Sequence, residues 1–457
     1  MQVRFSGTNL NRDEATGPPN YPQTVDALVA DEKQRTDFMK ACLAKLGLDV
    51  SQETQAVPSL SRLHLSAAQP GSVSELVHSW QEAGIITKEG GREIIKAEND
   101  TFLLETQEGG NWDLSAIKDA VPEDEAQADP AADREIDYNA LPKRLLTHET
   151  SLPESKETPY FNHHAFFSNL QHYHSKQRES SGAFGKTILY GEVVTSTSTL
   201  LEKNPNLLSL LPDGLTATAT TQVAGRGRGT NVWVSPPGSL MFSTVLRHSL
   251  SLSSTAPVVF VQYLAALAIV AGIHSYERGY EKLPIRLKWP NDIYALDPSR
   301  PASEEKYVKI GGILVNSSYA GGDYTLVVGI GLNTTNTAPT TSLSHLAAKA
   351  SLPPPTLEKL LASILAQFEG LYTRFCRTGW DKQFEETYYK SWLHTDQIVT
   401  LETQGGARAR IKGITSDWGL LVAEELGWQD WGTGKRWELQ SDSNSFDFFR
   451  GLLKRKT

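Results

Sequence analysis

A loop rich in glycine and arginine, residues 222–233, constrains this chain more than any other stretch. It reads QVAGRGRGTNVW, so three glycines alternate with two arginines ahead of a tryptophan. Glycine lets the backbone approach a ligand closely, and the planar, permanently charged guanidinium of arginine suits phosphate and carboxylate groups. Ordering such a loop costs conformational entropy, which a bound anion would offset. We therefore expect the loop to close over a small anionic ligand.

Two other interpretations of this loop are a nucleic-acid-binding stretch of the RGG kind and a plain surface turn. The chain has a formal net charge of -9, whereas a general nucleic-acid binder needs a basic face. The flanking sequence indicates a connection within a sheet, because residues 216–224 alternate like a strand and residues 239–246 form a second strand-like run. The loop should thus join two strands.

Length and cysteine content limit the class of protein. A chain of 457 residues should contain two to three domains. Its two cysteines, Cys42 and Cys376, provide neither a disulfide framework nor zinc-ligand spacing, so we expect a reducing, cytoplasmic location.

The first residues lack the apolar segment of a secretory signal. Residues 257–273 are too short and too interrupted for a membrane span, and they predict a buried helix.

The first third of the chain contains no catalytic constellation. Residues 1–110 have helical patterns at 37–46 and 74–83, and we interpret them as an accessory region. Residues 111–158 are rich in acids, Pro, Ser and Thr, and they predict a linker. Four histidines occur in residues 161–174 without a carboxylate or cysteine cluster, so we expect an amphipathic helix there instead of a metal site.

Hydroxyl residues 195–199 follow a strand-like run at 188–194 and precede a helical stretch. They can cap that helix or bind a polar ligand, and both interpretations stay open. Farther on, the patterns predict strands at 285–294, 306–316 and 324–333, helices over 355–393, and short strands separated by Gly-rich turns over 394–441.

Four motifs occur in a set order in the second half of the chain. They are Gly225-Arg-Gly-Arg-Gly229 with Trp233, Lys288-Trp-Pro-Asn-Asp292, Lys309-Ile-Gly-Gly-Ile-Leu-Val315 and Val328-Gly-Ile-Gly-Leu-Asn333. Their order and spacing resemble the biotin–protein ligases (holocarboxylase synthetases) over residues 185–445. The long N-terminal extension resembles the eukaryotic, fungal form. The helix-turn-helix of the bacterial repressor-type members is not seen, so no transcriptional role is carried over.

This resemblance implies an α+β fold: a class II aminoacyl-tRNA-synthetase-like, biotin–lipoate ligase catalytic domain with a mixed, mostly antiparallel sheet and helices on one side. An SH3-like β-barrel should follow it. The catalytic domain is then expected over 159–393 and the barrel over 394–457. The accessory region 1–110 and the linker 111–158 precede both, so residues 1–158 should be removable without loss of the core.

The resemblance also implies an activity. A biotin–protein ligase uses ATP, with Mg²⁺, to convert biotin into biotinyl-5′-AMP, and then transfers biotin to a lysine of a carboxylase's biotin-carrier domain. Acceptors of the acetyl-CoA carboxylase and pyruvate carboxylase type are expected partners. Nucleic acid and membrane are not expected partners, and the chain should be a monomer or weak dimer.

Site residues are carried over position by position. The expected catalytic residues are Lys309, Arg226 and Arg228. The expected biotin-binding residues are Ser196, Thr197, Ser198, Gln222, Arg226, Gly227, Arg228 and Lys309. The expected nucleotide-binding residues are Gly225, Gly229, Trp233, Lys288, Asn291 and Asn333. Asp292, or Asn291, could help to hold Mg²⁺. Ser198 departs from the bacterial pattern, which has asparagine at this position. Trp289, within the second motif, is expected to pack in the core.

Two alternatives are kept. A lipoate or octanoate protein ligase would share the fold, but the Gly/Arg loop with Trp233 and the Lys288–Asp292 motif count against it. A non-catalytic RNA-binding protein could also use the Gly/Arg loop, but net acidity and the strand-rich context oppose that function.

Overall fold

The computed structural model describes most of the second of two compact units. These units are Met1–Ala56 and Val57–Thr457. The described residues are 60–106, 138, 140–177, 181–229, 231–297, 300, 306–320, 322–337, 340–441, 444–447 and 451–455, without the side chains of 320, 444–447 and 452–455. The first unit, including the helix predicted over 37–46, lies outside them.

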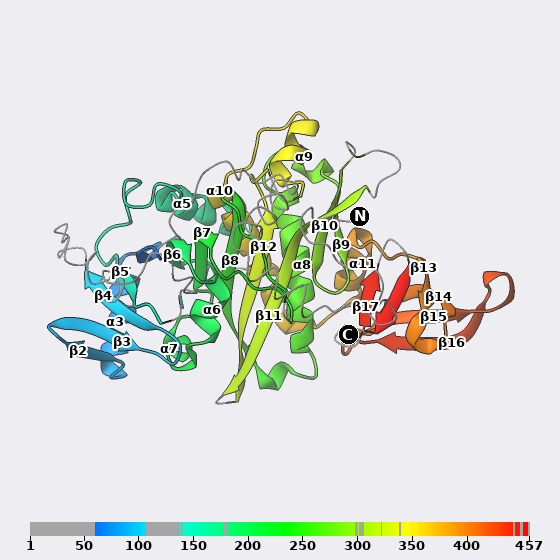
Figure 1. The fold of residues 1–457 in the computed structure, drawn as a ribbon, viewed down its shortest axis with the longest axis horizontal. Coiled ribbons are helices and arrows are strands. Elements are labelled where there is room, and N and C mark those ends of the chain that lie inside the picture. Colours follow the sequence, from blue (N-terminus) through cyan, green and yellow to red (C-terminus); the bar gives the residue numbers. More distant parts are fainter. Residues whose placement is uncertain are drawn as a thin grey trace, which may run out of the picture. The chain divides into compact units, whose positions relative to one another are not determined.

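A mixed sheet of twelve strands forms the centre of the second unit, in the order β2-β3-β4-β5-β1-β6-β7-β8-β12-β11-β10-β9 (Figure 1). Its strands are β1 (Leu63–Ala67), β2 (Ile86–Glu89), β3 (Arg92–Lys96), β4 (Thr101–Thr106), β5 (Lys143–Thr147), β6 (Thr187–Val194), β7 (Thr216–Gln222), β8 (Ser239–Ser249), β9 (Ile285–Lys288), β10 (Asp292–Leu296), β11 (Tyr307–Ala320) and β12 (Asp323–Asn333). The pairs β1–β5, β4–β5 and β6–β7 are parallel, and the other neighbouring pairs are antiparallel. The predicted mixed, mostly antiparallel sheet is confirmed.

The Gly/Arg loop joins β7 to β8, as the flanking alternation predicted. The predicted strands at 188–194, 306–316 and 324–333 correspond to β6, β11 and β12. The run 285–294 was expected to be one strand ending in a Pro290-Asn-Asp292 turn, and it forms two strands, β9 and β10, on either side of that turn. The chain reverses at Trp289–Asn291, so that β9 and β10 pair antiparallel with Lys288 opposite Asp292.

The helices of the described part have these bounds: α3 (Gly71–Glu82), α5 (His163–His174), α6 (Thr197–Glu202), α7 (Pro205–Leu210), α8 (Val261–His274), α9 (Leu343–Lys349), α10 (Leu357–Thr378) and α11 (Lys382–Ser391). Short 3-10 helices occur at Leu250–Leu252, Val258–Phe260, Tyr280–Lys282, Glu402–Gln404 and Trp428–Asp430. The predicted helices at 74–83 and 161–174 are present as α3 and α5. The apolar segment 257–273 forms the buried helix α8. No helix of the described residues is long and apolar enough to cross a membrane.

Helices cover both faces of the large sheet. On β8, Phe242 and Leu246 belong to a core shared with α5, α8 and α10, whereas Val245 belongs to a second core shared with α3, α6 and α7. Because successive side chains of a strand point to opposite faces, the two cores lie on opposite sides of the sheet. The expectation of helices on one side only is wrong, since α3, α6 and α7 pack on the face opposite α5, α8 and α10.

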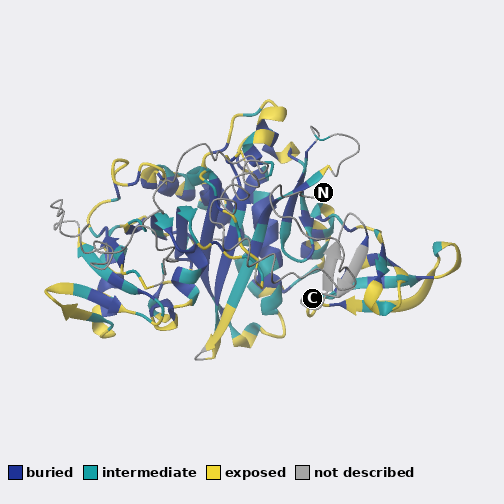
Figure 2. Cartoon of the chain, viewed as in Figure 1, coloured by how far each residue is buried: buried dark blue, intermediate teal, exposed yellow. Residues whose placement is uncertain are grey.

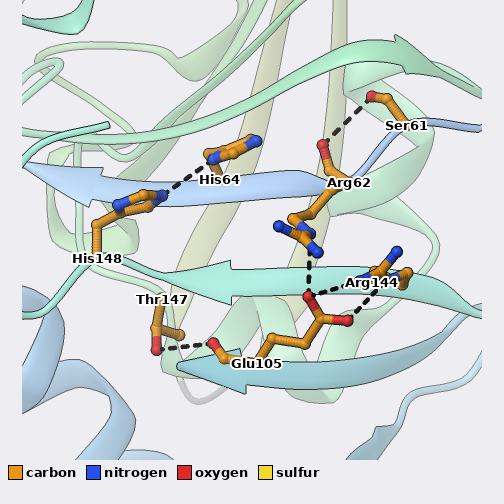
Figure 3. A network of polar contacts seen from close by, with 7 residues as sticks. All are labelled: Ser61, Arg62, His64, Glu105, Arg144, Thr147 and His148. Carbon is orange, nitrogen blue, oxygen red and sulfur yellow. Dashed lines mark hydrogen bonds and ion pairs between the residues drawn. The ribbon is translucent and has the colours of Figure 1, made fainter. Parts of the chain in front are cut away.

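The linker predicted over 111–158 is also wrong in part, because β5 lies within it. Leu145 and Leu146 are 3% and 5% exposed, and β5 pairs in parallel with both β1 and β4. Glu105 on β4 binds Arg62 at 3.0 Å and Arg144 on β5 at 2.5 Å, which ties these strands together (Figure 3). This short strand has only two apolar residues, Leu145 and Leu146, and it is buried by pairing with distant strands, which average composition does not show.

The boundary expected at residue 159 does not separate two domains. β1 pairs antiparallel with β6, from Leu63 opposite Gly191 to Ala67 opposite Thr187. Figure 2 shows buried residues on both sides of this junction, while the β2–β3 end is largely exposed. Described residues 60–106 and 140–158 therefore continue the sheet of the expected catalytic domain.

A second sheet of six strands follows, in the order β16-β15-β14-β13-β18-β17. Its strands are β13 (Ile398–Leu401), β14 (Ala407–Ile414), β15 (Leu421–Leu426), β16 (Gly432–Leu439), β17 (Asn444–Asp447) and β18 (Leu452–Arg455). An SH3-like β-barrel was expected over 394–457, and a separate small sheet at the C-terminus fits that expectation. Within the described residues β16 and β17 are its two edges, so the pairings trace an open order of strands.

Candidate active site

A cavity of about 600 Å³, here called the central cavity, lies where the Gly/Arg loop meets α6, the β9–β10 turn, β11 and β12. On the sheet, Gly312 is opposite Gly331 and Leu314 is opposite Gly329, and all four line the cavity. Residues directly opposite each other on neighbouring strands share a face. On β12 this is the face of Val327, which packs on the α6 side.

Glycines on β12 make room for the residues around the cavity. A Cβ at Gly331 would lie 2.6 Å from the indole of Trp233, and a Cβ at Gly329 would lie 2.5 Å from Ser198 Oγ. Both distances are far below an ordinary carbon contact. These two glycines therefore allow Trp233 and Ser198 to lie against the sheet, and they are more than strand irregularities.

The Gly/Arg loop folds back on itself as a narrow hairpin. The Trp233 N–H donates to Gly225 O at 2.9 Å and the Gly227 N–H donates to Asn231 O at 2.8 Å. Gly225 and Gly229, expected to bind nucleotide, do not line the cavity. A Cβ at Gly225 would lie 2.3 Å from Trp233 O, and Gly229 has a φ of +63°. The backbone of the hairpin is sufficient reason for glycine at both positions.

Both arginines of the loop line the central cavity and have partners from other elements. Arg226 forms an ion pair with Glu202, the last residue of α6. Arg228 donates to the hydroxyl of Ser441 at 3.0 Å, just beyond β16. The loop is thus anchored at one side by α6 and at the other by the C-terminal sheet.

Hydroxyl side chains form one wall of the cavity. Ser196 caps α6 by accepting from the Thr199 N–H at 3.4 Å, so the capping interpretation holds for this residue. Thr197 and Ser198 hydrogen-bond to Ser243 on β8, at 2.8 and 2.9 Å, and both line the cavity. The Thr197 N–H also donates to the side-chain oxygen of Gln222 at 2.8 Å. Capping and cavity lining therefore occur side by side along residues 196–198.

Ser243 was missed by the sequence analysis. It is fully buried and it joins the hydroxyls of Thr197 and Ser198. A small polar residue in the middle of the apolar run Ser239–Ser249 was the available signal, because a buried hydroxyl needs a hydrogen-bond partner.

Two lysines and one aspartate form the opposite, charged side. Lys309 Nζ lies 2.6 Å from Asp292 Oδ1, and Lys288 Nζ lies 3.5 Å from Asp292 Oδ2. Lys309 Nζ also lies 5.9 Å from the centre of a Trp233 ring. Nearby, the Asn333 side-chain amide donates to Thr340 Oγ1 at 2.8 Å, and Thr340 donates to Lys309 O at 2.9 Å. The charge of Asp292 is thus shared between two ammonium groups.

Asp292 is the one carboxylate among the described residues that line the cavity. Within the described residues no group of three or more His, Cys, Asp or Glu side chains could hold a metal ion. The side-chain amide of Asn291 already has a hydrogen-bond partner, because it donates to Ile313 O at 2.7 Å. An aspartate that already neutralises two lysines, next to an amide that binds the backbone, is a poor ligand set for Mg²⁺.

A buried histidine supports the turn between β9 and β10. The Trp289 N–H donates to His394 Nε2 at 3.0 Å, and His394 Nδ1 contacts Gln397 Oε1 at 3.1 Å. Burial lowers the pKa of His394 to about 4, so the ring is neutral at pH 7 and can accept this bond. Trp289 is 2% exposed and its indole N–H donates to Gly419 O at 3.1 Å. The expectation of a core role for Trp289 is confirmed.

Thirteen of the fifteen expected site residues meet at this one cavity: Ser196, Thr197, Ser198, Gln222, Arg226, Gly227, Arg228, Trp233, Lys288, Asn291, Asp292, Lys309 and Asn333. Gly225 and Gly229 are the other two. The cavity is also lined by residues that had no assigned role, among them Asn231, Val232, Val234, Thr340 and Ser441. Val232 and Val234, on either side of Trp233 in the sequence, are apolar and yet 76% and 54% exposed.

Comparisons with known proteins identify relatives of this chain. Residues 190–333 match the family model described as "Biotin/lipoate A/B protein ligase family", and residues 1–67 match "Biotin-protein ligase, N terminal". The biotin–protein ligase of Schizosaccharomyces pombe is 35% identical over 439 residues, which is 93% of this chain and 65% of that protein. Biotin–protein ligase 2 of Arabidopsis thaliana is 33% identical over 287 residues, 61% of this chain and 79% of that protein.

Among solved structures, a biotin protein ligase from Aquifex aeolicus in complex with biotin and ATP has a TM-score of 0.39 and 21% identity, covering 59% of this chain and 99% of that one. The chain spans just under two thirds of the length of its fission yeast relative. The chain covers 79% of the Arabidopsis relative at 33% identity, and it therefore belongs to the biotin–protein ligase family.

Proposed function

We propose that this chain is an ATP-dependent ligase that activates biotin as biotinyl-5′-AMP and transfers it to a lysine of carboxylase biotin-carrier domains. The observation that carries the proposal is the meeting of Arg226, Arg228, Lys309 and Lys288 with the hydroxyl wall at one cavity, in a chain of this family. Four cations beside neutral hydrogen-bonding groups suit a ligand with an anionic end and a polar, uncharged end.

In the proposed first step, a carboxylate oxygen of biotin attacks the α-phosphorus of ATP. A new O–P bond forms, the bond to the β-phosphate oxygen breaks, and pyrophosphate leaves. Negative charge develops on the phosphoryl oxygens, so fixed cations are needed where it develops. Arg226, Arg228 and Lys309 are assigned this role. Asp292 keeps the Lys309 ammonium oriented through the 2.6 Å ion pair.

In the proposed second step, the acceptor lysine amine attacks the carbonyl carbon of the mixed anhydride and AMP leaves. The anhydride must be kept from water, and the hairpin of the Gly/Arg loop is suited to cover it. Thr197, Ser198 and Gln222 are assigned to the ureido end of biotin, with Ser196 beside them. Trp233, Lys288, Asn291 and Asn333 are assigned to the nucleotide, with Trp233 stacking on adenine.

Mg²⁺ is proposed only as the ion that accompanies the phosphates of ATP, because the protein side chains around Asp292 are committed to other partners. A cytoplasmic monomer or weak dimer that acts on carboxylases of the acetyl-CoA or pyruvate type completes the proposal. No role for nucleic acid or membrane is included.

A lipoate ligase remains the second candidate, because the family model covers both kinds of ligase. The names of the relatives favour biotin. An RNA-binding role is opposed by the inward position of the loop, since both arginines line the cavity and are held by Glu202 and Ser441.

The test is pyrophosphate release by the purified chain with ATP, Mg²⁺ and one acid at a time. We expect release with biotin and none with lipoate or without acid. Release only with lipoate would replace the proposal with the second candidate, and release with neither acid would overturn ligase function. Labelling of a purified biotin-carrier domain, and of its acceptor Lys→Arg variant as control, tests the transfer step.

A further inference from the structure

Helix α6 contacts the Gly/Arg loop at two places. At its start, the Thr197 N–H donates to the side-chain oxygen of Gln222, the last residue of β7 and the first of the loop, at 2.8 Å. At its end, Glu202 forms the ion pair with Arg226. The helix thus lies along the side of the loop, with its first residues in the wall of the central cavity.

The end of α6 is held firmly in place. Asn204 donates to Leu200 O at 3.0 Å and to Asp100 Oδ2 at 2.7 Å, and its side-chain oxygen accepts from the Asn99 and Asp100 N–H groups at 3.0 Å each. Asn204 and Asp100 are 0% and 2% exposed. Because these bonds fix the last turn of α6 to the segment before β4, Glu202 cannot follow Arg226 over a large displacement.

The two partners of the ion pair differ in exposure. The Arg226 side chain is 40% exposed and faces the cavity, while the Glu202 side chain is 11% exposed. If Arg226 turns to a ligand oxygen, Glu202 is left as a poorly solvated carboxylate without its cation. That state carries a desolvation penalty, so Glu202 and an anionic ligand compete for one guanidinium.

We propose that Glu202 is a positioning residue that competes with the ligand for Arg226 and thereby weakens ligand binding and favours release. The inference rests on the proposed function, in which Arg226 binds a carboxylate or phosphate oxygen. Through Asn204 and Asp100, the strength of this competition depends on the N-terminal strands, although these lie away from the cavity.

Glu202→Gln is the informative substitution, because it keeps size and hydrogen-bonding capacity but removes the charge. Calorimetric titration with biotin alone and with ATP alone separates the two sources of negative charge. We expect the dissociation constant of at least one probe to fall about two- to fivefold, the size expected for a partly exposed ion pair. The probe that gains affinity identifies the oxygen that Arg226 binds.

A double-mutant cycle distinguishes competition from a general effect on the helix. Loss of negative charge at a helix C-terminus is mildly stabilising in itself, and that effect does not need Arg226. In an Arg226→Gln background, Glu202→Gln should therefore give no gain in affinity for either probe. Glu89→Gln, which breaks the exposed Glu89–Lys96 pair on the β2–β3 hairpin, is the matched control and should change neither dissociation constant.

Three results would overturn the inference: unchanged binding of both probes by Glu202→Gln, weaker binding, or a gain that persists without Arg226. Weaker binding would mean that Glu202 holds Arg226 ready for the ligand. Failure of the proposed function is seen separately, as wild-type protein that does not release pyrophosphate with biotin. If the wild-type enzyme releases pyrophosphate with biotin and Glu202→Gln binds both probes with unchanged dissociation constants, only the proposed competition is refuted.

Discussion

Two aspartate–lysine pairs in the large sheet have almost the same length and different surroundings. Lys143 Nζ lies 2.5 Å from Asp100 Oδ1, with side chains 2% and 0% exposed. Lys309 Nζ lies 2.6 Å from Asp292 Oδ1, with side chains 42% and 16% exposed. The first pair lies among the N-terminal strands and the second lies at the central cavity, so the same chemistry occurs in a packed interior in one place and at a cavity wall in the other.

The further partners of each lysine explain the difference. Lys143 also donates to Tyr138 O and Leu141 O, at 3.0 and 3.1 Å, so its ammonium is surrounded by protein oxygens. Lys309 is nearly half exposed toward the cavity, with Asp292 on one side and the Trp233 ring at 5.9 Å. A buried ammonium with three acceptors is fixed, whereas a half-exposed one can contact a ligand while it keeps its carboxylate.

The largest expected effect comes from removing the region of the buried pair. Deletion of residues 1–158 takes away β1 to β5 and leaves β6 without the neighbour it pairs with from Leu63 to Ala67. Although the sequence predicted a separable core, we now expect an insoluble product, because an apolar edge strand is exposed. Deletion of residues 1–56 keeps the whole second compact unit and should give soluble protein with cooperative unfolding. A soluble, active chain beginning at residue 159 would show that the strands around the buried Asp100–Lys143 pair are not needed for the fold.

Lys143→Met should destabilise the protein by about 3–5 kcal/mol, because it leaves the buried Asp100 carboxylate uncompensated. Urea unfolding followed by tryptophan fluorescence measures the loss. The double variant Asp100→Asn/Lys143→Met should recover much of it, since the unpaired charge is gone. Biotin-dependent pyrophosphate release per folded molecule should stay near wild type, and a loss of catalysis at unchanged stability would contradict a packing role.

Lys309→Met should have the opposite profile. Removing one charge from the transition state should lower biotin-dependent pyrophosphate release by about 100- to 1,000-fold. The unfolding midpoint in urea should change little, because this lysine is half exposed. Lys96→Met, at an exposed pair on β3, is the control for general charge effects. Near-normal turnover in Lys309→Met would remove the catalytic assignment.

A smaller effect is expected from the buried histidines His64 on β1, His148 after β5 and His163 on α5. His64 on β1 lies 2.9 Å from His148 (Figure 3), and His163 lies 2.9 Å from Ser66. Burial lowers the pKa of His64 and His163 to about 3 and that of His148 to about 4, from 6.5. Between pH 6.5 and 4 the unfolded chain therefore binds more protons than the native state, so stability is full above about 6.5 and falls as the pH falls.

Each such histidine should contribute up to about 1.4 kcal/mol per pH unit in this window. Urea unfolding at several pH values between 7 and 4.5 should therefore give a shallower slope for His64→Phe than for wild type. His78→Gln, at a side chain that is 69% exposed, should leave the slope unchanged. Equal slopes for His64→Phe and wild type would show that this cluster does not control acid stability.

Much of the candidate site was predictable because its residues occur in short, dense motifs. The Gly/Arg loop and the Lys288–Asp292 turn combine a conformational requirement with charge, which the local sequence shows, and the resemblance of the four motifs to one family supplied the individual site residues. The flanking alternation placed the loop between two strands, and the apolar run 257–273 identified α8. All of these depend on neighbours in sequence.

Only the tertiary structure decided which distant segments complete the site and the sheet. Glu202, Ser243 and Ser441 reach the loop or its cavity wall from three separate places in the chain, and the local sequence does not show which residues they contact. β5 has the composition of a linker and is buried because β1 and β4 pair with it on both sides. Local patterns determine conformation and charge over a few residues. Strand pairing and packing bring together residues about 20 to more than 200 positions apart, and the resulting burial distinguishes the enclosed Asp100–Lys143 pair from the partly exposed Asp292–Lys309 pair.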